Sequence, residues 1–146
     1  MTRKATLYTR VGDDGYTGVL GRERVAKYDL MPVAYGTVDE LSAQLALART
    51  AARHPDTNGM LLEVQRDLYA AMADLATTPE AAGKVGVRLY EPRIAWLEAL
   101  IDQVGQQVEI PPAFIISGDS YAGALLDVAR TRSEERRVGK ECRSRW

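Results

Sequence analysis

Apolar residues recur every three to four positions in four separate segments of this 146-residue chain, which places them on one face of an α-helix in each segment. Prolines and capping residues predict that these helices begin near Pro32, at Thr57 or Asn58, near Pro92, and after the turn at Ser117–Ser120. No stretch alternates for long enough to predict a strand. The sequence therefore predicts an all-α fold, an up-and-down helical bundle. The apolar positions of the four segments are Val38, Leu41, Leu45 and Ala48; Leu61, Val64, Leu68, Met72 and Leu75; Ile94, Leu97, Ile101 and Val104; and Ala122, Leu125, Leu126 and Ala129.

The bulk properties exclude several function classes. The net charge is −1, so nothing in the totals indicates a nucleic-acid or membrane partner. No apolar run is long enough for a membrane span, and the first ten residues turn polar before a secretory signal could form. The single cysteine, Cys142, excludes a disulfide within the chain and a zinc site of several cysteines. We expect one domain in a reducing cytoplasm.

The amino-terminal segment, residues 8–18, has the composition of a phosphate-binding loop. Its first ten residues contain two glycines, two threonines and an arginine. Glycine lets backbone N–H groups approach an anion, hydroxyls donate further hydrogen bonds, and a cation neutralises charge. The Gly-Lys-Ser/Thr ending of a Walker A loop is absent. On composition alone, an ordinary turn-rich terminus is the simpler explanation.

Three further residues are candidates for a functional site, and each also has a purely structural explanation. Asp39, like its neighbour Glu40, lies early in a predicted helix, where the helix dipole favours carboxylates. Asp39 also lies beside the apolar stripe, where it could pair with an arginine of another helix or subunit. Phe114 is the only phenylalanine, and a core position is the default for it. Arg130 lies on an apolar-rich helix and needs a partner there.

Taken in order, these segments resemble the PduO-type corrinoid adenosyltransferases. Six motifs between residues 8 and 131 match the family pattern, each weak alone and specific together. They are Tyr8–Thr17, Tyr35–Leu41, Gln65–Pro79, Trp96–Asp102, Phe114–Asp119 and Ala129–Arg130. The resemblance implies a ferritin-like helical bundle that assembles as a homotrimer, with ATP and a corrinoid meeting at subunit interfaces. It also implies an enzyme that transfers the 5′-deoxyadenosyl group of ATP to the cobalt of reduced cob(I)alamin and releases triphosphate.

The resemblance also assigns roles to residues. Asp39 and Arg130 would form a salt bridge across the subunit interface, and Phe114 would lie below the corrin ring and keep the lower axial ligand away. Mg²⁺ would accompany ATP, and a corrinoid reductase could be a partner. No residue is assigned as a metal ligand. The residues expected to bind ATP are Thr9, Arg10, Val11, Gly12, Asp13, Gly15, Thr17, Gly18 and Lys27.

Two parts of the chain depart from the family pattern. The loop after Phe114 reads Ile-Ser-Gly-Asp where the family has Leu-Pro-Gly-Gly, and Asp127 replaces a histidine that many members have. Residues 132–146, with six basic and three acidic residues, resemble the translation of a sequencing adapter. We therefore expect residues 1–131 to be an incomplete adenosyltransferase domain that lacks its last helix, followed by a non-native tail. In that tail Glu134 falls where the family has a second ATP-binding arginine, so the chain as given is expected to be unstable or inactive.

Two other functions fit parts of the sequence. The helical periodicity alone is equally typical of a non-catalytic helical-bundle fragment that mediates interactions. A corrinoid carrier or ATP-binding regulator would keep both binding sites and lack the reaction. The glycine- and threonine-rich segment favours the two functions that need a triphosphate site.

Overall fold

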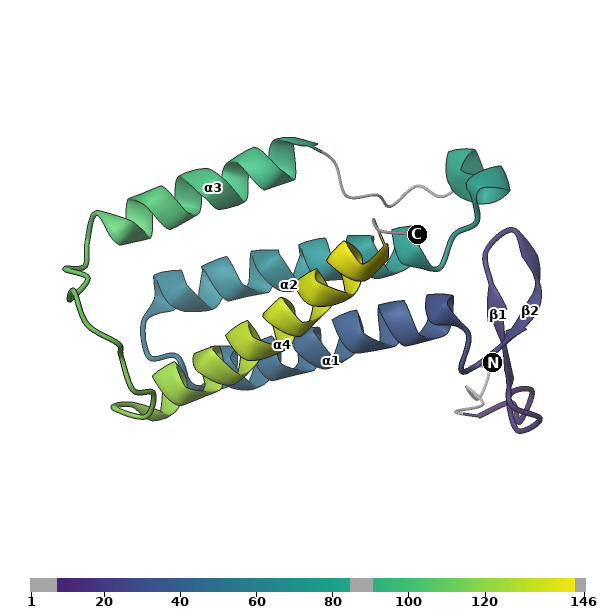
Figure 1. Ribbon diagram of the computed structural model, residues 1–146, viewed down its shortest axis with the longest axis horizontal. Helices are drawn as coiled ribbons and strands as arrows, with labels where there is room; N and C mark the ends of the chain where they lie inside the picture. Colours follow the sequence, from purple (N-terminus) through teal and green to yellow (C-terminus); the bar gives the residue numbers. More distant parts are fainter. Residues whose placement is uncertain (1–7, 85–90, 144–146) are drawn as a thin grey trace, which may run out of the picture.

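The computed structural model describes residues 8–84 and 91–143 and shows a mostly helical chain with a small amino-terminal hairpin (Figure 1). The all-α prediction is confirmed for the body of the molecule, and successive helices run in opposite directions. The elements are strands β1 (Tyr16–Val19) and β2 (Arg22–Ala26), helices α1 (Leu30–Ala51) and α2 (Pro55–Leu75), the 3₁₀ helix η1 (Pro79–Lys84), and helices α3 (Glu91–Gly105) and α4 (Tyr121–Arg143).

The helix starts follow local capping chemistry. Asp29 caps α1 by accepting a hydrogen bond from the backbone N–H of Met31 (3.1 Å), and Pro32 lies in the first turn, close to the predicted start. The predicted start of α2 at Thr57 or Asn58 is wrong, because α2 begins at Pro55, whose fixed φ and missing N–H suit the first helical position. The Asn58 side chain instead donates to the carbonyl of Arg49 (3.1 Å) and ties α2 to the end of α1.

Helices α1, α2 and α4 pack side by side and form the core. The apolar face of α1 is buried as predicted, and Leu41 and Leu45 meet Ala129 of α4. The partly buried side chains of α2 that complete this cluster are Leu61, Val64 and Leu68.

Helix α3 lies apart from this core (Figure 1). Its predicted stripe at Ile94, Leu97, Ile101 and Val104 is not buried, since these side chains are between 40% and 62% exposed. Polar contacts attach α3 to α2: Arg93 donates from Nε to Oδ1 of Asp67 (2.7 Å) and from Nη2 to Oδ2 (2.9 Å). The periodicity thus predicted the helix and its apolar stripe, and the stripe is exposed because no described element covers that face.

The hairpin of β1 and β2 was not predicted, since strands of four and five residues are too short to show a clear alternation. Its turn uses Gly21 at φ +99°, a conformation that favours glycine. A Cβ atom at Gly21 would lie 2.3 Å from Oγ1 of Thr78, so the turn packs tightly against the connection between α2 and η1. Leu20 also pairs there, donating to the carbonyl of Ala76 and accepting from the N–H of Thr78, both at 2.9 Å.

No helix in the described part of the chain has both the length and the apolar character needed to cross a membrane.

Candidate functional site

The amino-terminal glycine loop, residues 9–15, is a series of tight turns. The N–H of Asp13 donates to the carbonyl of Arg10, and that of Gly15 to the carbonyl of Gly12, each at 3.2 Å. Arg10 and Gly15 both have positive φ, +59° and +84°. Turns that mix right- and left-handed conformations direct successive backbone N–H groups toward one side, which makes a concave site for an anion. In this loop the N–H groups of Asp13 and Gly15 are already engaged by loop carbonyls, so its phosphate-binding role stays a prediction.

Lys27 lies against the glycine loop, although eleven residues separate it from the end of the loop in sequence. It follows β2 directly, and its backbone N–H donates to the carbonyl of Gly15 (2.9 Å). A Cβ atom at Gly12 would lie 3.1 Å from the ammonium nitrogen of Lys27. The hairpin therefore returns the chain so that this cation and the loop lie together. Of the other residues expected to bind ATP, Thr17 and Gly18 lie on β1.

Arg24 on β2 contacts the glycine loop at several points, and the sequence did not single it out. Its guanidinium donates from Nη1 to Oδ2 of Asp14 (2.8 Å) and from Nη2 to Oδ1 (2.6 Å). Nη2 also donates to the carbonyls of Tyr16 (2.9 Å) and Val11. This hydrogen bonding from Arg24 lowers the pKa of Asp14 and raises that of Arg24. Arg24 thus fixes the shape of the glycine loop from the opposite strand, a relation visible only once the hairpin is known.

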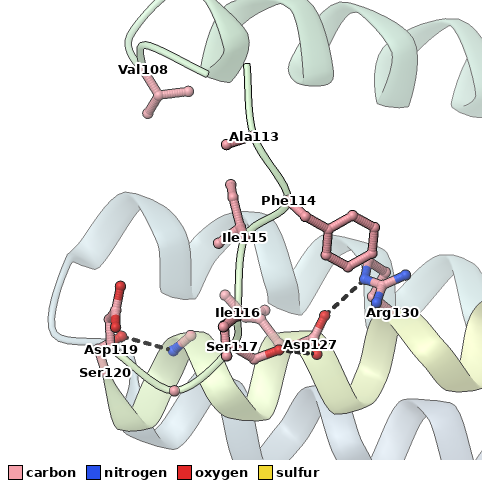
Figure 2. Close-up of a pocket in the computed structure, with 13 residues that line it drawn as sticks. Val108, Ala113, Phe114, Ile115, Ile116, Ser117, Asp119, Ser120, Asp127 and Arg130 are labelled. Atoms are coloured by element: carbon pink, nitrogen blue, oxygen red, sulfur yellow. Dashed lines mark hydrogen bonds and ion pairs between the residues drawn. The ribbon is translucent and has the colours of Figure 1, made fainter. Parts of the chain in front are cut away.

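The second candidate region is an open, mainly apolar cavity of about 1080 Å³ between the α3–α4 connection and the first turns of α4 (Figure 2). Residues 113–120 of that connection, here named the Phe114 loop, form most of its wall. Phe114 is fully exposed, so the default expectation of a core position is wrong. An exposed phenylalanine beside Ile115 and Ile116, also exposed, forms an apolar surface suited to a large flat ligand.

Arg130 lines the same cavity, and its side chain is exposed, so the expectation that a burying environment would require a partner does not apply. Its Nε donates to Oδ1 of Asp127 (2.8 Å), one turn earlier on α4, and the hydroxyl of Ser117 donates to Oδ2 (2.5 Å) (Figure 2). The hydrogen bond from Ser117, and then that from Arg130, lower the pKa of Asp127. The structure therefore brings together Phe114 and Arg130 of the predicted residues and adds Ser117 and Asp127.

Asp39 does not join this group within one chain. It is exposed on α1, and among the described residues no ion pair connects it to Arg130. Its neighbour Glu40 pairs instead with Arg132 of α4. The predicted salt bridge of Asp39 and Arg130 concerns two subunits, so it stays a prediction.

The glycine loop and the Phe114 loop lie at opposite ends of the helical body (Figure 1). The hairpin lies where α1 begins and α2 ends, whereas the α3–α4 connection lies where α1 ends and α2 begins. Within one chain, the polar glycine loop and the apolar cavity beside the Phe114 loop are therefore not in contact.

Comparison with known proteins identifies the family. Residues 7–145 match the family model described as cobalamin adenosyltransferase. The chain belongs to the cobalamin adenosyltransferase family. It is 38% identical over 125 residues to a corrinoid adenosyltransferase of Citrobacter freundii, a match covering 86% of this chain and 71% of that protein. It is 40% identical over 128 residues to one of Mycobacterium tuberculosis (strain ATCC 25618 / H37Rv), covering 86% and 66%. A match to the corrinoid adenosyltransferase PduO of Citrobacter freundii, 38% identical, covers 90% of this chain and 40% of that protein.

Solved structures agree with this family membership. The chain superposes with a TM-score of 0.82 and 29% identity on a PduO-type ATP:corrinoid adenosyltransferase from Lactobacillus reuteri, covering 94% of this chain and 78% of that one. That protein is a variant with one phenylalanine replaced by alanine, complexed with cobalamin and ATP. A second variant of that enzyme, with lysine in place of an arginine and complexed with ATP, gives a TM-score of 0.79 and the same coverage. The fold of this cobalamin adenosyltransferase is therefore that of the PduO type.

Proposed function

We propose that this chain binds ATP and reduced cobalamin and transfers the 5′-deoxyadenosyl group of ATP to cobalt. The observation that carries the proposal is the glycine loop held against Lys27, in a chain of the cobalamin adenosyltransferase family. An interaction module made only of helices would have no need of that loop. In the proposed reaction the C5′–O bond of ATP breaks, triphosphate leaves with the bonding electron pair, and a cobalt–carbon bond forms.

The glycine loop would bind the triphosphate. Backbone N–H groups and the Lys27 ammonium would stabilise the charge that accumulates on the leaving group. Mg²⁺ prefers oxygen ligands and commonly takes one or two carboxylates together with phosphate oxygens. Asp13 is the exposed carboxylate of the loop that suits this role, because Asp14 is engaged by Arg24. No cluster of three or more metal-ligating side chains occurs among the described residues, which fits an ion held mainly by the nucleotide.

The cavity beside Phe114 would bind the corrinoid. The apolar ring of Phe114 would occupy the lower face of the corrin and keep an axial ligand away from cobalt. Removing that ligand makes cobalt(II) easier to reduce to the nucleophilic cobalt(I) state. Reduced cobalt must be supplied to the site, so a corrinoid reductase in the cytoplasm is the expected partner. Cobalamin itself supplies the bond-forming chemistry, and the protein supplies position and electrostatics.

The active site would form between subunits of a homotrimer. The opposite positions of the glycine loop and the Phe114 loop in one chain support this arrangement, because ATP and cobalt must come within bonding distance. A neighbouring subunit would place its glycine loop near the Phe114 loop of the first. Asp39 of one subunit would then pair with Arg130 of the next.

The test is to mix the purified chain with ATP, cobalamin and a strong reductant and to follow the cobalt–carbon product by absorbance. Binding of both ligands without product would favour the carrier function, unless Glu134 is the obstacle. A carboxylate at that position repels triphosphate, so the variant Glu134→Arg separates the two explanations. Product from Glu134→Arg alone would place the fault at residue 134. Because residues 1–131 are expected to lack the last helix, the same assay is also run on the full-length parent protein, and binding of both ligands by that parent without product would overturn the proposed activity.

We also propose that residues 132–146 are foreign to the natural protein, because they resemble a translated adapter, even though the family-model match extends to residue 145. Helix α4 continues through this segment as far as Arg143. Most of its residues have fair helix propensity, so a helix forms whatever its origin. Sequencing the source DNA across codon 132 tests the proposal, and genomic sequence that continues into the same residues would refute it.

A further inference from the structure

We propose that Asp127 is a positioning residue that joins the Phe114 loop to Arg130 and sets the direction in which Arg130 presents its terminal nitrogens. The inference rests on the proposed function, because it concerns the cavity assigned there to the corrinoid. Asp127 and Ser117 line that cavity, but neither is among the residues to which the family resemblance assigns a role.

The two oxygens of one carboxylate serve two different elements. Oδ1 accepts from Nε of Arg130 on the same helix, at 2.8 Å, and Oδ2 accepts from the hydroxyl of Ser117 in the Phe114 loop, at 2.5 Å (Figure 2). Asp127 is the more buried member of its ion pair, with a side chain 34% exposed against 63% for Arg130. Ser117 lies three residues after Phe114, so its bond to α4 limits where the Phe114 ring can lie.

The contact leaves the outer part of the guanidinium available. Asp127 engages only Nε, and within the described part of the chain the two Nη groups of Arg130 have no hydrogen-bond partner. A guanidinium held at its inner edge presents its terminal nitrogens as donors in a fixed direction, which suits a second carboxylate. In the proposed trimer, the carboxylate that accepts from these terminal nitrogens of Arg130 is that of Asp39 in a neighbouring subunit.

Aspartate is the residue type that can make this connection. An ionised carboxylate is an acceptor at both oxygens, whereas a neutral histidine has one acceptor nitrogen. The histidine that many family members have at this position could therefore not accept from both Ser117 and Arg130. The Ser117 hydroxyl and the Asp127 carboxylate depart from the family pattern together, and they contact each other.

The experiment compares Asp127→Ala and Ser117→Ala with two controls. Asp119→Ala removes a carboxylate from the same cavity without touching Arg130, and Ser117→Thr keeps the hydroxyl. The first readout needs no ligand: the ¹⁵N NMR signal of the Arg130 Nε–H group, assigned by its loss in Arg130→Lys. We expect Asp127→Ala to shift this signal and Asp119→Ala to leave it unchanged. An unchanged signal in Asp127→Ala, or an equal shift in Asp119→Ala, would overturn the inference.

The second readout is the affinity for cobalamin, measured by absorbance titration. We expect Asp127→Ala and Ser117→Ala each to weaken binding by about two- to fivefold, as for an exposed charged contact. The double variant should lose no more than Asp127→Ala alone, because the two residues act through one contact. Ser117→Thr should restore binding, and its failure to do so would argue against the hydroxyl. If the parent chain binds no cobalamin while its Nε–H signal responds as expected, the proposed function fails and the contact stands.

Discussion

The two candidate regions of this chain are held in place in different ways. In the glycine loop, Arg24 makes four hydrogen bonds and the backbone closes two further turns, so the loop has its shape without a ligand. The Phe114 loop is exposed throughout and is tied to α4 through the Asp127 carboxylate and the Ser120 cap. A region that binds a small, highly charged group gains from preorganised donors. A region that receives a large apolar ring gains from open apolar surface that a neighbouring subunit can complete.

The largest expected effect is on the glycine-loop side, from Lys27→Gln. Removing the cation that lies against Gly12 should weaken ATP binding by about ten- to hundredfold, since charge-assisted bonds to phosphate are among the stronger ones. Isothermal titration calorimetry with ATP measures this, and cobalamin affinity should not change. The control is Arg53→Gln, an exposed cation in the connection that follows α1. Equal losses in both variants would mean that Lys27 acts only through the overall charge.

Phe114→Ala tests the other region. Because Phe114 is fully exposed, its removal should leave the melting temperature unchanged and lower kcat/KM for cobalamin by about tenfold or more, with ATP affinity intact. If the parent chain is inactive, the comparison is made in the Glu134→Arg background. Ile110→Ala is the matched control, an exposed apolar residue of the same connection that does not line the cavity. A drop in melting temperature with Phe114→Ala would instead place this ring in a packed environment.

These two regions differ also in how far the sequence could predict them. The helices were predictable because the 3.6-residue period is local, as at Leu41 and Leu45. The hairpin was not, since its turn at Gly21 is fixed by Thr78, which lies far along the chain. Arg24 was missed for the same reason, because only the paired strands bring it beside Asp14.

In the Phe114 region, contacts between residues close in sequence could be predicted, whereas contacts between distant residues could not. The Asp127–Arg130 pair is one helical turn apart and could have been predicted from spacing alone. The bond from Ser117 could not, since it depends on how the loop folds back over α4. The stripe of α3 could be predicted as one face of a helix, but whether it is buried depends on a neighbour that the described residues do not supply.

Arg24→Lys is expected to have a smaller effect than loss of Lys27, because Arg24 shapes the glycine loop rather than contacting phosphate. Lysine keeps the charge but cannot donate in a fork to both oxygens of Asp14. We expect ATP affinity to fall by about three- to tenfold in Arg24→Lys and to fall further in Arg24→Ala. Calorimetry measures both affinities. Asp14→Asn should resemble Arg24→Lys. ATP affinity that is unchanged in Arg24→Ala would show that the loop takes its shape from its turns alone.

The smallest effect is a change in titration that compares the two carboxylates directly. The pKa of Asp14 is lowered first by Arg24, whereas that of Asp127 is lowered first by Ser117. A lowered pKa in the folded state means that the contact stabilises the chain above the ordinary aspartate pKa and is lost as pH falls through the folded-state value. Ser117→Ala should therefore raise the pKa of Asp127 and leave that of Asp14 unchanged. Arg24→Lys should raise the pKa of Asp14 and leave that of Asp127 unchanged. Carboxyl ¹³C NMR titration measures both. If Ser117→Ala does not change the pKa of Asp127, the Ser117 hydroxyl does not donate to Asp127 in solution. The Phe114 loop would then lack this contact to α4, and the difference from the glycine loop would be larger.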